Sequence, residues 1–426
     1  MSPNLNVRAA SSSGLDGPIL CFYTVKEQDW QPDDTIPVPD EPLPLPHQQS
    51  LKTNEQRWTM QTAAHKNIIL QKLNCLIEAF TPILYEDDEI FLKNMQEKNL
   101  AGDDIRRYQH WEWTQGVGLY GLWKLFASTR EQKYLDVLTK FYDAQLEIGF
   151  PALNVNTITP FLTMSYVGEY LQDEKYLAPC REAASWIMER FPRTQEGGFQ
   201  HMTSDTFNDQ ELWDDTLFMT VLFLANMGRI EDKRGYIDEA QRQFLLHAKY
   251  LADEQTGLWY HGWTFNGCHN FAGAFWGRGN CWVTIAIPEF LQMVDCDAAV
   301  KELLTRVLCH QVDSLVKYQN ENGMWHTLID DPSSYVESSA TCGFGYGILR
   351  GVRMGLLPAA YEQTAWKALE PILAYIGDDG VVQQVSYGTP MGRETKDFYK
   401  QIEIKPMPYG QTLAMLFLIE CMSEEK

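Results

Sequence analysis

The sequence predicts an all-α protein in which helical hairpins repeat along the chain. Three observations support this fold class: apolar residues recur with helical spacing from residue 54 on, few stretches alternate as strands do, and a glycine-aromatic phrase returns between alternate helices. The predicted helices are 54–80, 113–128, 132–147, 157–171, 175–190, 210–227, 234–252, 281–295, 299–319, 336–354, 360–376 and 408–423.

The repeated phrase consists of a glycine, an aromatic or aliphatic residue and, in most copies, a polar residue. It begins at Gly149, Gly198, Gly257, Gly323 and Gly380, and subtraction of these numbers gives intervals of 49, 59, 66 and 57 residues. A unit of this length suits a helical hairpin whose apolar face must be covered by its neighbours. Six hairpins are enough to close a ring, although an open superhelix would show the same period.

The predicted helices alternate between two kinds. Residues 217–225 and 413–419 are apolar nearly all round and are expected in an inner ring, whereas 234–250 carry a charged face and are expected outside it. This alternation favours a double ring. The long loops would then gather at one end of the ring, where we expect the ligand site.

Residues 1–50 differ in amino-acid composition from the rest of the chain. They contain eight of its 20 prolines together with the run Ser11-Ser12-Ser13-Gly14. Proline excludes long helices, so we predict an irregular, proline-rich N-terminal extension over residues 1–50. The helical domain is predicted to occupy residues 51–426.

Charge and hydropathy narrow the choice of partner and compartment. The formal net charge is −22, from 57 acidic and 35 basic residues, which argues against nucleic acid or an anionic membrane surface as a partner. No apolar run reaches 18 residues, and the first residues lack a basic segment followed by an apolar one. We therefore expect a soluble, cytoplasmic protein that is a monomer or a weak homo-oligomer.

The cysteine pattern and the short motifs give no support for a cofactor. Nine scattered cysteines without a CxxC pair indicate neither a disulfide framework nor a zinc site. The helical region contains no GxGxxG before a strand and no P-loop or GxSxG motif, so nucleotide binding and serine hydrolysis have no support either. We expect neither a cofactor nor a metal ion.

An acidic cluster runs directly into an apolar helix at residues 209–219. Asp209 is expected to cap this helix, with Glu211, Asp214 and Asp215 in its first turn, where the helix dipole favours negative charge. Carboxylates at the start of a buried helix indicate a cavity that they face. Simple capping of the helix is the alternative.

Aromatic residues concentrate between residues 259 and 282. Four tryptophans (Trp259, Trp263, Trp276 and Trp282) and five glycines in this stretch favour a groove lined with rings, and rings stack well on sugar faces. Arg278 lies between two glycines just before a predicted helix, where its fork can bind a carboxylate or form a structural salt bridge. His261 is interpreted as a hydrogen-bonding residue rather than a metal ligand.

Two further segments place polar and aromatic residues just before predicted helices. Trp113 lies in residues 108–118, and Asn156 lies in residues 154–160. For both segments, ordinary capping and contact with a substrate are equally good interpretations. His201 closes the copy of the glycine phrase that begins at Gly198.

Several separated motifs together resemble glycoside hydrolase family 105, the unsaturated rhamnogalacturonyl hydrolases. They are LWDDTLFM at 212–219, GLWYHG at 257–262, WGRGNCW at 276–282 and GMWH at 323–326, within a resemblance that covers about residues 100 to 425. The resemblance implies an (α/α)6 barrel of six helical hairpins. It also implies an enzyme that removes the 4,5-unsaturated uronic acid from the non-reducing end of oligosaccharides that lyases release from pectin.

The same resemblance assigns roles to individual residues. Asp215 is expected to protonate C4 of the unsaturated sugar and to help water add at C5, a hydration that needs no second catalytic carboxylate. Arg278 is the expected partner of the substrate carboxylate, and Asn156 is expected near the reacting sugar. The remaining predicted substrate contacts are His261, Trp276, Trp282, Trp113, His201 and Trp213.

Other function classes remain open at this point. An inverting glycosidase on the same ring would need a second carboxylate, and a sugar epimerase would depend on paired histidines such as His201 and His261. A non-catalytic repeat protein that binds oligosaccharides is the third class. The sequence does not identify the sugar that follows the unsaturated uronate.

Overall fold

The computed structural model describes residues 51–423. The predicted proline-rich extension at residues 1–50 lies outside these residues, so it stays a prediction. The features described below belong to the compact unit that begins at Thr59, apart from the first eight residues of the first helix.

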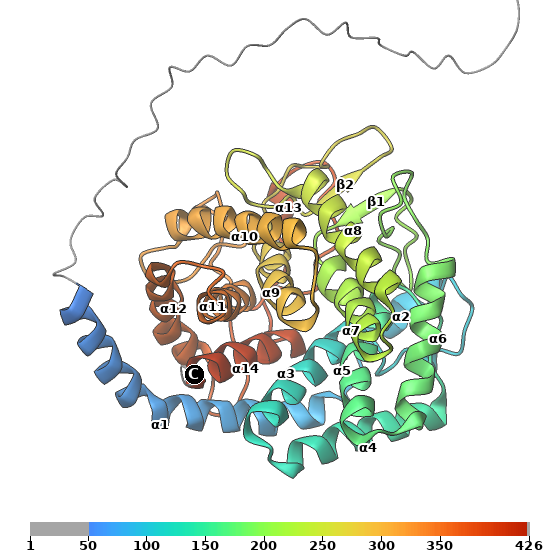
Figure 1. Cartoon of the computed structure of the whole chain (residues 1–426), viewed down its shortest axis with the longest axis horizontal. Coiled ribbons are helices and arrows are strands. Elements are labelled where there is room, and N and C mark those ends of the chain that lie inside the picture. Colours follow the sequence, from blue (N-terminus) through green and yellow to red (C-terminus); the bar gives the residue numbers. More distant parts are fainter. Residues whose placement is uncertain (1–50, 424–426) are drawn as a thin grey trace, which may run out of the picture. The chain divides into compact units, whose positions relative to one another are not determined.

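Within residues 51–423, twelve long helices form a double ring (Figure 1). The inner helices are α3 (Trp113–Thr129), α5 (Val155–Leu171), α7 (Leu222–Ile230), α9 (Gly277–Met293), α11 (Ser338–Arg353) and α14 (Pro408–Met422). The outer helices are α1 (Leu51–Ile83), α4 (Gln132–Ile148), α6 (Glu174–Arg190), α8 (Arg234–Leu251), α10 (Ala298–Tyr318) and α12 (Glu362–Tyr375). None of the helices in this part of the chain is long and apolar enough to cross a membrane.

The inner ring is closed. Each inner helix packs on the next in chain order, and α14 packs back on α3. The predicted (α/α)6 barrel is therefore confirmed, and an open superhelix is excluded. Each inner helix except α14 is followed by an outer helix that packs against it, as in α3 with α4 and α11 with α12.

Burial follows the predicted alternation between inner and outer helices. Every residue of α14 from Tyr409 to Glu420 is buried, and α7 is buried from Leu222 to Gly228. In α8, by contrast, buried residues such as Phe244 and Leu251 alternate with exposed charged ones. Apolar burial on both sides of the inner helices and on one side of the outer helices makes one continuous core.

Three of the repeated glycines, Gly257, Gly323 and Gly380, lie where a hairpin meets the next outer helix. Gly257 has a φ of +70°, and a Cβ added there would lie 2.6 Å from the backbone of His310 in α10. Gly380 repeats this arrangement at the end of the chain, since its added Cβ would lie 2.1 Å from the carbonyl oxygen of Cys75 in α1. Only glycine tolerates such contacts, so these copies of the phrase lie where neighbouring hairpins of the ring meet.

Shorter elements lie between the long helices. They are α2 (Glu89–Lys98), α13 (Asp397–Lys400), the 3-10 helices η1 (Ile105–Arg107) and η3 (Ala359–Tyr361), and the strands β1 (Glu211–Trp213) and β2 (Gly262–Thr264). The strands pair antiparallel with Leu212 opposite Trp263. The sequence did not predict these elements because none is long enough to show a clear apolar period.

The start of the predicted helix 210–227 is wrong. Residues 211–213 form β1, a turn follows at Asp214 and Asp215, and the helix begins with the π-helical turn η2 (Leu217–Val221) before α7. Asp209 is exposed and does not cap the helix. The backbone of β1 is instead satisfied by β2, whose residues lie some 50 positions further along the chain and leave no local signal.

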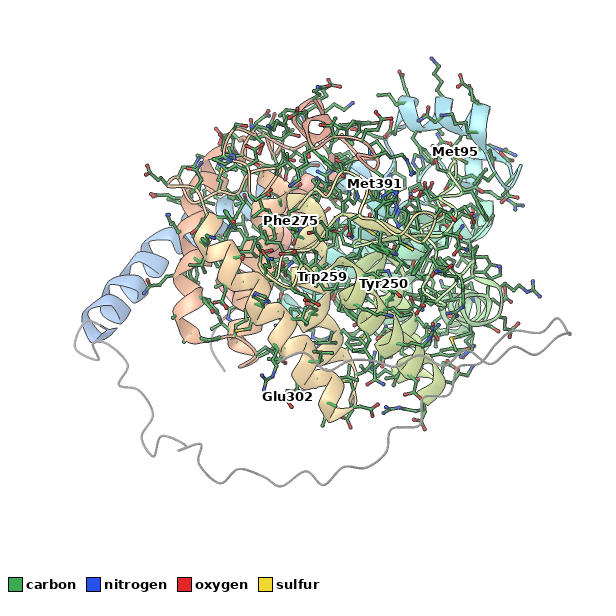
Figure 2. The ribbon with its side chains drawn as sticks, turned by 90° about the horizontal axis from the view of Figure 1, so that it is seen from above. Met95, Tyr250, Trp259, Phe275, Glu302 and Met391 are labelled. Carbon is green, nitrogen blue, oxygen red and sulfur yellow. The ribbon has the colours of Figure 1, made fainter. Side chains whose placement is uncertain are left out.

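Figure 2 shows the two ends of the ring. Met95 of α2 and Met391 lie at one end, among the loops, whereas Glu302 near the start of the outer helix α10 lies at the other. Inner and outer helices of a hairpin run in opposite directions, so the inner helices begin at the end that carries Met391.

Candidate active site

A cavity of about 490 Å³ opens at the end of the ring where the inner helices begin. Its wall includes Trp113 at the start of α3, Asn156 at the start of α5, Asp215 just before η2, Arg278 in the first turn of α9 and Tyr409 at the start of α14. Helix N-termini carry partial positive charge, so the ring directs several of them towards one space. Such a cavity favours an anionic ligand.

Asp215 is a carboxyl of this wall. Its side chain is 17% exposed, and its Oδ1 atom lies 3.3 Å from Nδ1 of His201. Burial raises the pKa of Asp215 to about 7, although the charge of Arg278 and nearby backbone N–H groups act in the opposite direction. A carboxyl with this pKa can both give and take a proton at neutral pH.

Asp214 lies behind Asp215 and does not reach the cavity. It is completely buried, and neither carboxyl oxygen has a hydrogen-bond partner among the described residues. Its Oδ2 atom packs so closely on α9 that a Cβ added at Gly279 would lie 2.3 Å away. Burial and the neighbouring Asp215 raise the pKa of Asp214 well above its usual value.

His201 and Trp213 form a stacked pair beside Asp215. Their ring centroids are 4.1 Å apart with an angle of 5° between the planes, and both residues line the cavity. Nδ1 of His201 also lies 2.8 Å from Oγ1 of Thr216. Burial lowers the pKa of His201 to about 3, so its ring is neutral near Asp215.

Aromatic rings make up another part of the wall. Trp113 stacks on Tyr409 with centroids 4.7 Å apart, and Trp282 approaches Trp113 edge-on at 6.4 Å. Trp276 lines the cavity as well. Flat apolar faces beside hydrogen-bonding groups suit the two kinds of surface that a sugar ring presents.

Arg278 is packed more tightly than the sequence predicted. It is 1% exposed and lies between the rings of Trp276 and Tyr409. Its terminal nitrogens donate to Ser386, Tyr387 and Thr389, at 2.6 Å to the Ser386 hydroxyl. Arg278 lies inside α9, which begins at Gly277, rather than before the predicted start of the helix at residue 281. Its Nε–H is buried and has no hydrogen-bond partner among the described residues.

His261 is the predicted contact that does not line the cavity. Its ring is buried between Trp213 and Trp276, with centroids 5.1 and 4.3 Å away. Nδ1 lies 2.7 Å from the hydroxyl of Tyr399. His261 therefore lies behind two wall residues, and β2, which begins at the next residue, holds it there.

The family comparison decides what kind of protein carries this cavity. The model of Glycosyl Hydrolase Family 88 matches residues 88–424. The chain belongs to this family. The unsaturated rhamnogalacturonyl hydrolase YesR of Bacillus subtilis is 31% identical over 319 residues, which cover 74% of this chain and 91% of that protein.

Solved structures agree with this assignment. A possible member of the GH105 family from Klebsiella pneumoniae is 42% identical, with a TM-score of 0.76 over 82% of this chain and 92% of that chain. A possible GH105 member from Salmonella enterica serovar Paratyphi A is 43% identical, with a TM-score of 0.75 over 82% and 93%. The predicted family relationship is confirmed, and this family 88 protein is a glycoside hydrolase.

The cavity wall also contains residues that the sequence interpretation missed. They include Glu112 and Tyr409 at the starts of inner helices, Asp88 at the N-cap of α2 and Asn94 within it, Ser204, Asp205, Met219, and residues of the segment 387–393 such as Arg393. Glu112 and Tyr409 could have been found from the sequence, because each lies at the start of a predicted inner helix. The loop 387–393 carries no comparable pattern in the sequence.

No group of three or more His, Cys, Asp or Glu residues within residues 51–423 is arranged to hold a metal ion. The expectation of no metal and no cofactor stays a prediction. The wall offers two carboxyls with a pKa of about 7, Asp215 and Glu112, together with the polar side chains of Arg278 and Asn156 and several aromatic faces. These groups suit proton transfer to a bound sugar.

Proposed function

We propose that this glycoside hydrolase removes the 4,5-unsaturated uronic acid from the non-reducing end of oligosaccharides that lyases release from rhamnogalacturonan. The observation that carries the proposal is Asp215, a wall carboxyl whose pKa burial raises to about 7, beneath aromatic rings that suit a sugar. The relative YesR, named an unsaturated rhamnogalacturonyl hydrolase, supports the choice of substrate.

The proposed reaction is hydration of an enol ether. Protonated Asp215 gives its proton to C4, and positive charge develops at C5 and the ring oxygen. Water then forms a bond to C5 while the Asp215 carboxylate takes one of its protons, which restores the acid. The hemiketal opens at the bond between C5 and the ring oxygen, and the glycosidic bond breaks as C1 becomes an aldehyde.

The neutral state of His201 supports this role for Asp215. Its pKa of about 3 leaves the ring uncharged at pH 7, so His201 does not hold Asp215 permanently ionised. The charge of Arg278 favours the carboxylate form that the first step creates. Arg278 and the helix N-termini around the cavity are the groups proposed to bind the uronate carboxylate.

An inverting glycosidase is the second candidate, because Glu112 is a second buried carboxyl in the wall. Such an enzyme would act on saturated sugars with Glu112 and Asp215 as its acid and base. Activity on saturated substrates separates the two proposals. The cytoplasmic location expected from the sequence belongs to the first proposal and stays a prediction.

An ultraviolet assay tests the proposal. Unsaturated disaccharides from rhamnogalacturonan, galacturonan and glucuronan are supplied in parallel, and loss of the conjugated double bond is followed. We expect loss with the rhamnogalacturonan product first. Release of sugar from saturated substrates alone, with every double bond intact, would overturn the proposal in favour of the glycosidase.

A further inference from the structure

We propose that Glu112 determines which sugar is accepted after the unsaturated uronate: its carboxylate binds hydroxyl groups of an uncharged sugar and repels a sugar that carries its own carboxylate. This inference rests on the proposed function, since it concerns the neighbouring part of the same cavity. It gives Glu112 a binding role in the wall, separate from the proton transfers at Asp215.

Glu112 is held in a fixed position at the wall. It is 6% exposed, lies at the N-cap of α3 and lines the cavity. The hydroxyl of Ser204 donates to its Oε1 atom at 2.6 Å, and the amide of Asn156 also stabilises its ionised form. Ser204 in turn accepts at 3.0 Å from Asn154, the residue that caps α5. This chain of hydrogen bonds joins α3, α5 and the loop 201–208.

The hydrogen-bond partners of Glu112 are all neutral. Within the described residues, no Lys or Arg lies in an ion pair with Glu112, whereas Glu211 of the same cavity end pairs with Arg393 at 2.7 Å. Ser204 occupies one oxygen, and the contact from the Trp113 N–H to the other is long, at 3.4 Å. The second oxygen is therefore free to accept from a sugar hydroxyl.

Charge is distributed unevenly round the cavity. Asp88 and Asp205 line it together with Glu112, and Asp205 is close enough to raise the pKa of Glu112. Arg278 stands on α9, three places from α3 in the ring order and therefore on the opposite side. A substrate with one carboxylate fits this arrangement when the carboxylate faces Arg278, and a second carboxylate near Glu112 meets like charge.

The ionised form of Glu112 is accessible under assay conditions. Burial raises its pKa to about 7, against the hydrogen bond from Ser204. At pH 8 the carboxylate is the main species, so repulsion of a second uronate is fully developed there. Binding measurements at pH 8 thus give the clearest comparison between ligands.

The test uses binding rather than turnover. In the Asp215→Asn protein, calorimetry compares an unsaturated uronate linked to rhamnose with one linked to galacturonate. We expect the rhamnose ligand to bind more tightly, and Glu112→Gln to reduce this preference by about tenfold or more, since juxtaposed like charges are costly. Glu112→Asp keeps the charge and should keep the preference.

Glu239→Gln is the matched control, because Glu239 is a half-buried carboxylate of the outer helix α8 that pairs with Arg193 and does not line the cavity. This control should leave the preference unchanged. An unaltered preference in Glu112→Gln would overturn the inference, and so would equal weakening of both ligands, which indicates a purely structural cap. Failure of the proposed function is seen separately, as absence of double-bond loss in the unsubstituted enzyme.

Discussion

Buried carboxyl groups lie in two regions of the inner ring, and the regions differ in how those groups are partnered. Towards the far ends of the inner helices, Glu289 accepts from the hydroxyls of Tyr120 and Tyr346 and pairs with Lys124 at 2.7 Å. At the cavity, Asp214 and Oδ1 of Asp215 have no hydrogen-bond partner in the described part of the chain. Both regions are aromatic and buried, so burial alone does not distinguish them.

The two regions also differ in the pKa of their carboxyl groups. Burial would raise the pKa of Glu289, but the charges of Lys124 and Arg350 lower it to about 2. At the cavity the charge of Arg278 and nearby backbone N–H groups offset the effect of burial only in part, and the pKa of Asp215 rises to about 7. A fully partnered carboxyl stabilises the fold, whereas a carboxyl left without partners keeps the capacity to exchange protons with a ligand.

The largest expected effect comes from removing the proton at the cavity. Asp215→Asn should lower kcat by about a thousandfold, since acid-base catalysis contributes roughly 10² to 10⁴. Its melting temperature should not fall, because the change removes an unfavourable buried charge. Asp209→Asn, which changes an exposed aspartate outside the wall, is the control and should retain activity. Near-normal turnover in Asp215→Asn would mean that another group moves the proton.

The opposite outcome is expected at the far end of the ring. Glu289→Gln should lower the free energy of unfolding by about 3 kcal/mol at pH 7, because it leaves the charge of Lys124 unpaired in a partly buried site. The remaining folded enzyme should keep its KM. The pKa of Glu289 in the folded state is about 2, whereas its ordinary value is 4.5. Its contribution to the free energy of unfolding is therefore present above pH 4.5 and is lost as the pH falls towards 2. Denaturant unfolding at several pH values measures this, and a difference that grows in acid would contradict it.

The smallest expected effect is a gain of stability at Asp214. Its folded pKa is raised, so the folded state binds its proton more tightly than the unfolded state, and stability falls as pH rises from about 4 towards the folded value. Asp214→Asn cannot ionise and should therefore be more stable than the parent at pH 8. The advantage should vanish at pH 4, which melting curves at the two pH values can check.

The fold was predictable because its main signal is long and repeated. Helices such as α14 are apolar all round, and glycines such as Gly257 recur where hairpins meet. The strand β1 was not predictable, because three residues give no period and their partner β2 lies far along the chain. The error at Asp209 follows from this, since a residue that precedes a strand and one that caps a helix look alike in sequence.

The candidate site was predictable only in part. Trp276, Trp282 and Asp215 stand in dense motifs, and all three line the cavity. Glu112 and Tyr409 are single residues at the starts of helices and belong to no recognisable motif. They can be assigned to the cavity only when the ring places the starts of the inner helices side by side. His261 shows the reverse case, because a motif marks it while the packing of Trp213 and Trp276 places it behind the wall.

Closure of the ring by α14 has a consequence for the order in which the enzyme matures. Tyr409 completes a wall whose other residues begin at Asp88, and the contact between α14 and α3 joins segments about 290 residues apart. Contacts of such long sequence separation form late, because the intervening loop must first be ordered. A chain still leaving the ribosome contains Asp215 before the cavity wall is complete. We therefore expect hydrolysis only after α14 has been synthesised and has packed on α3.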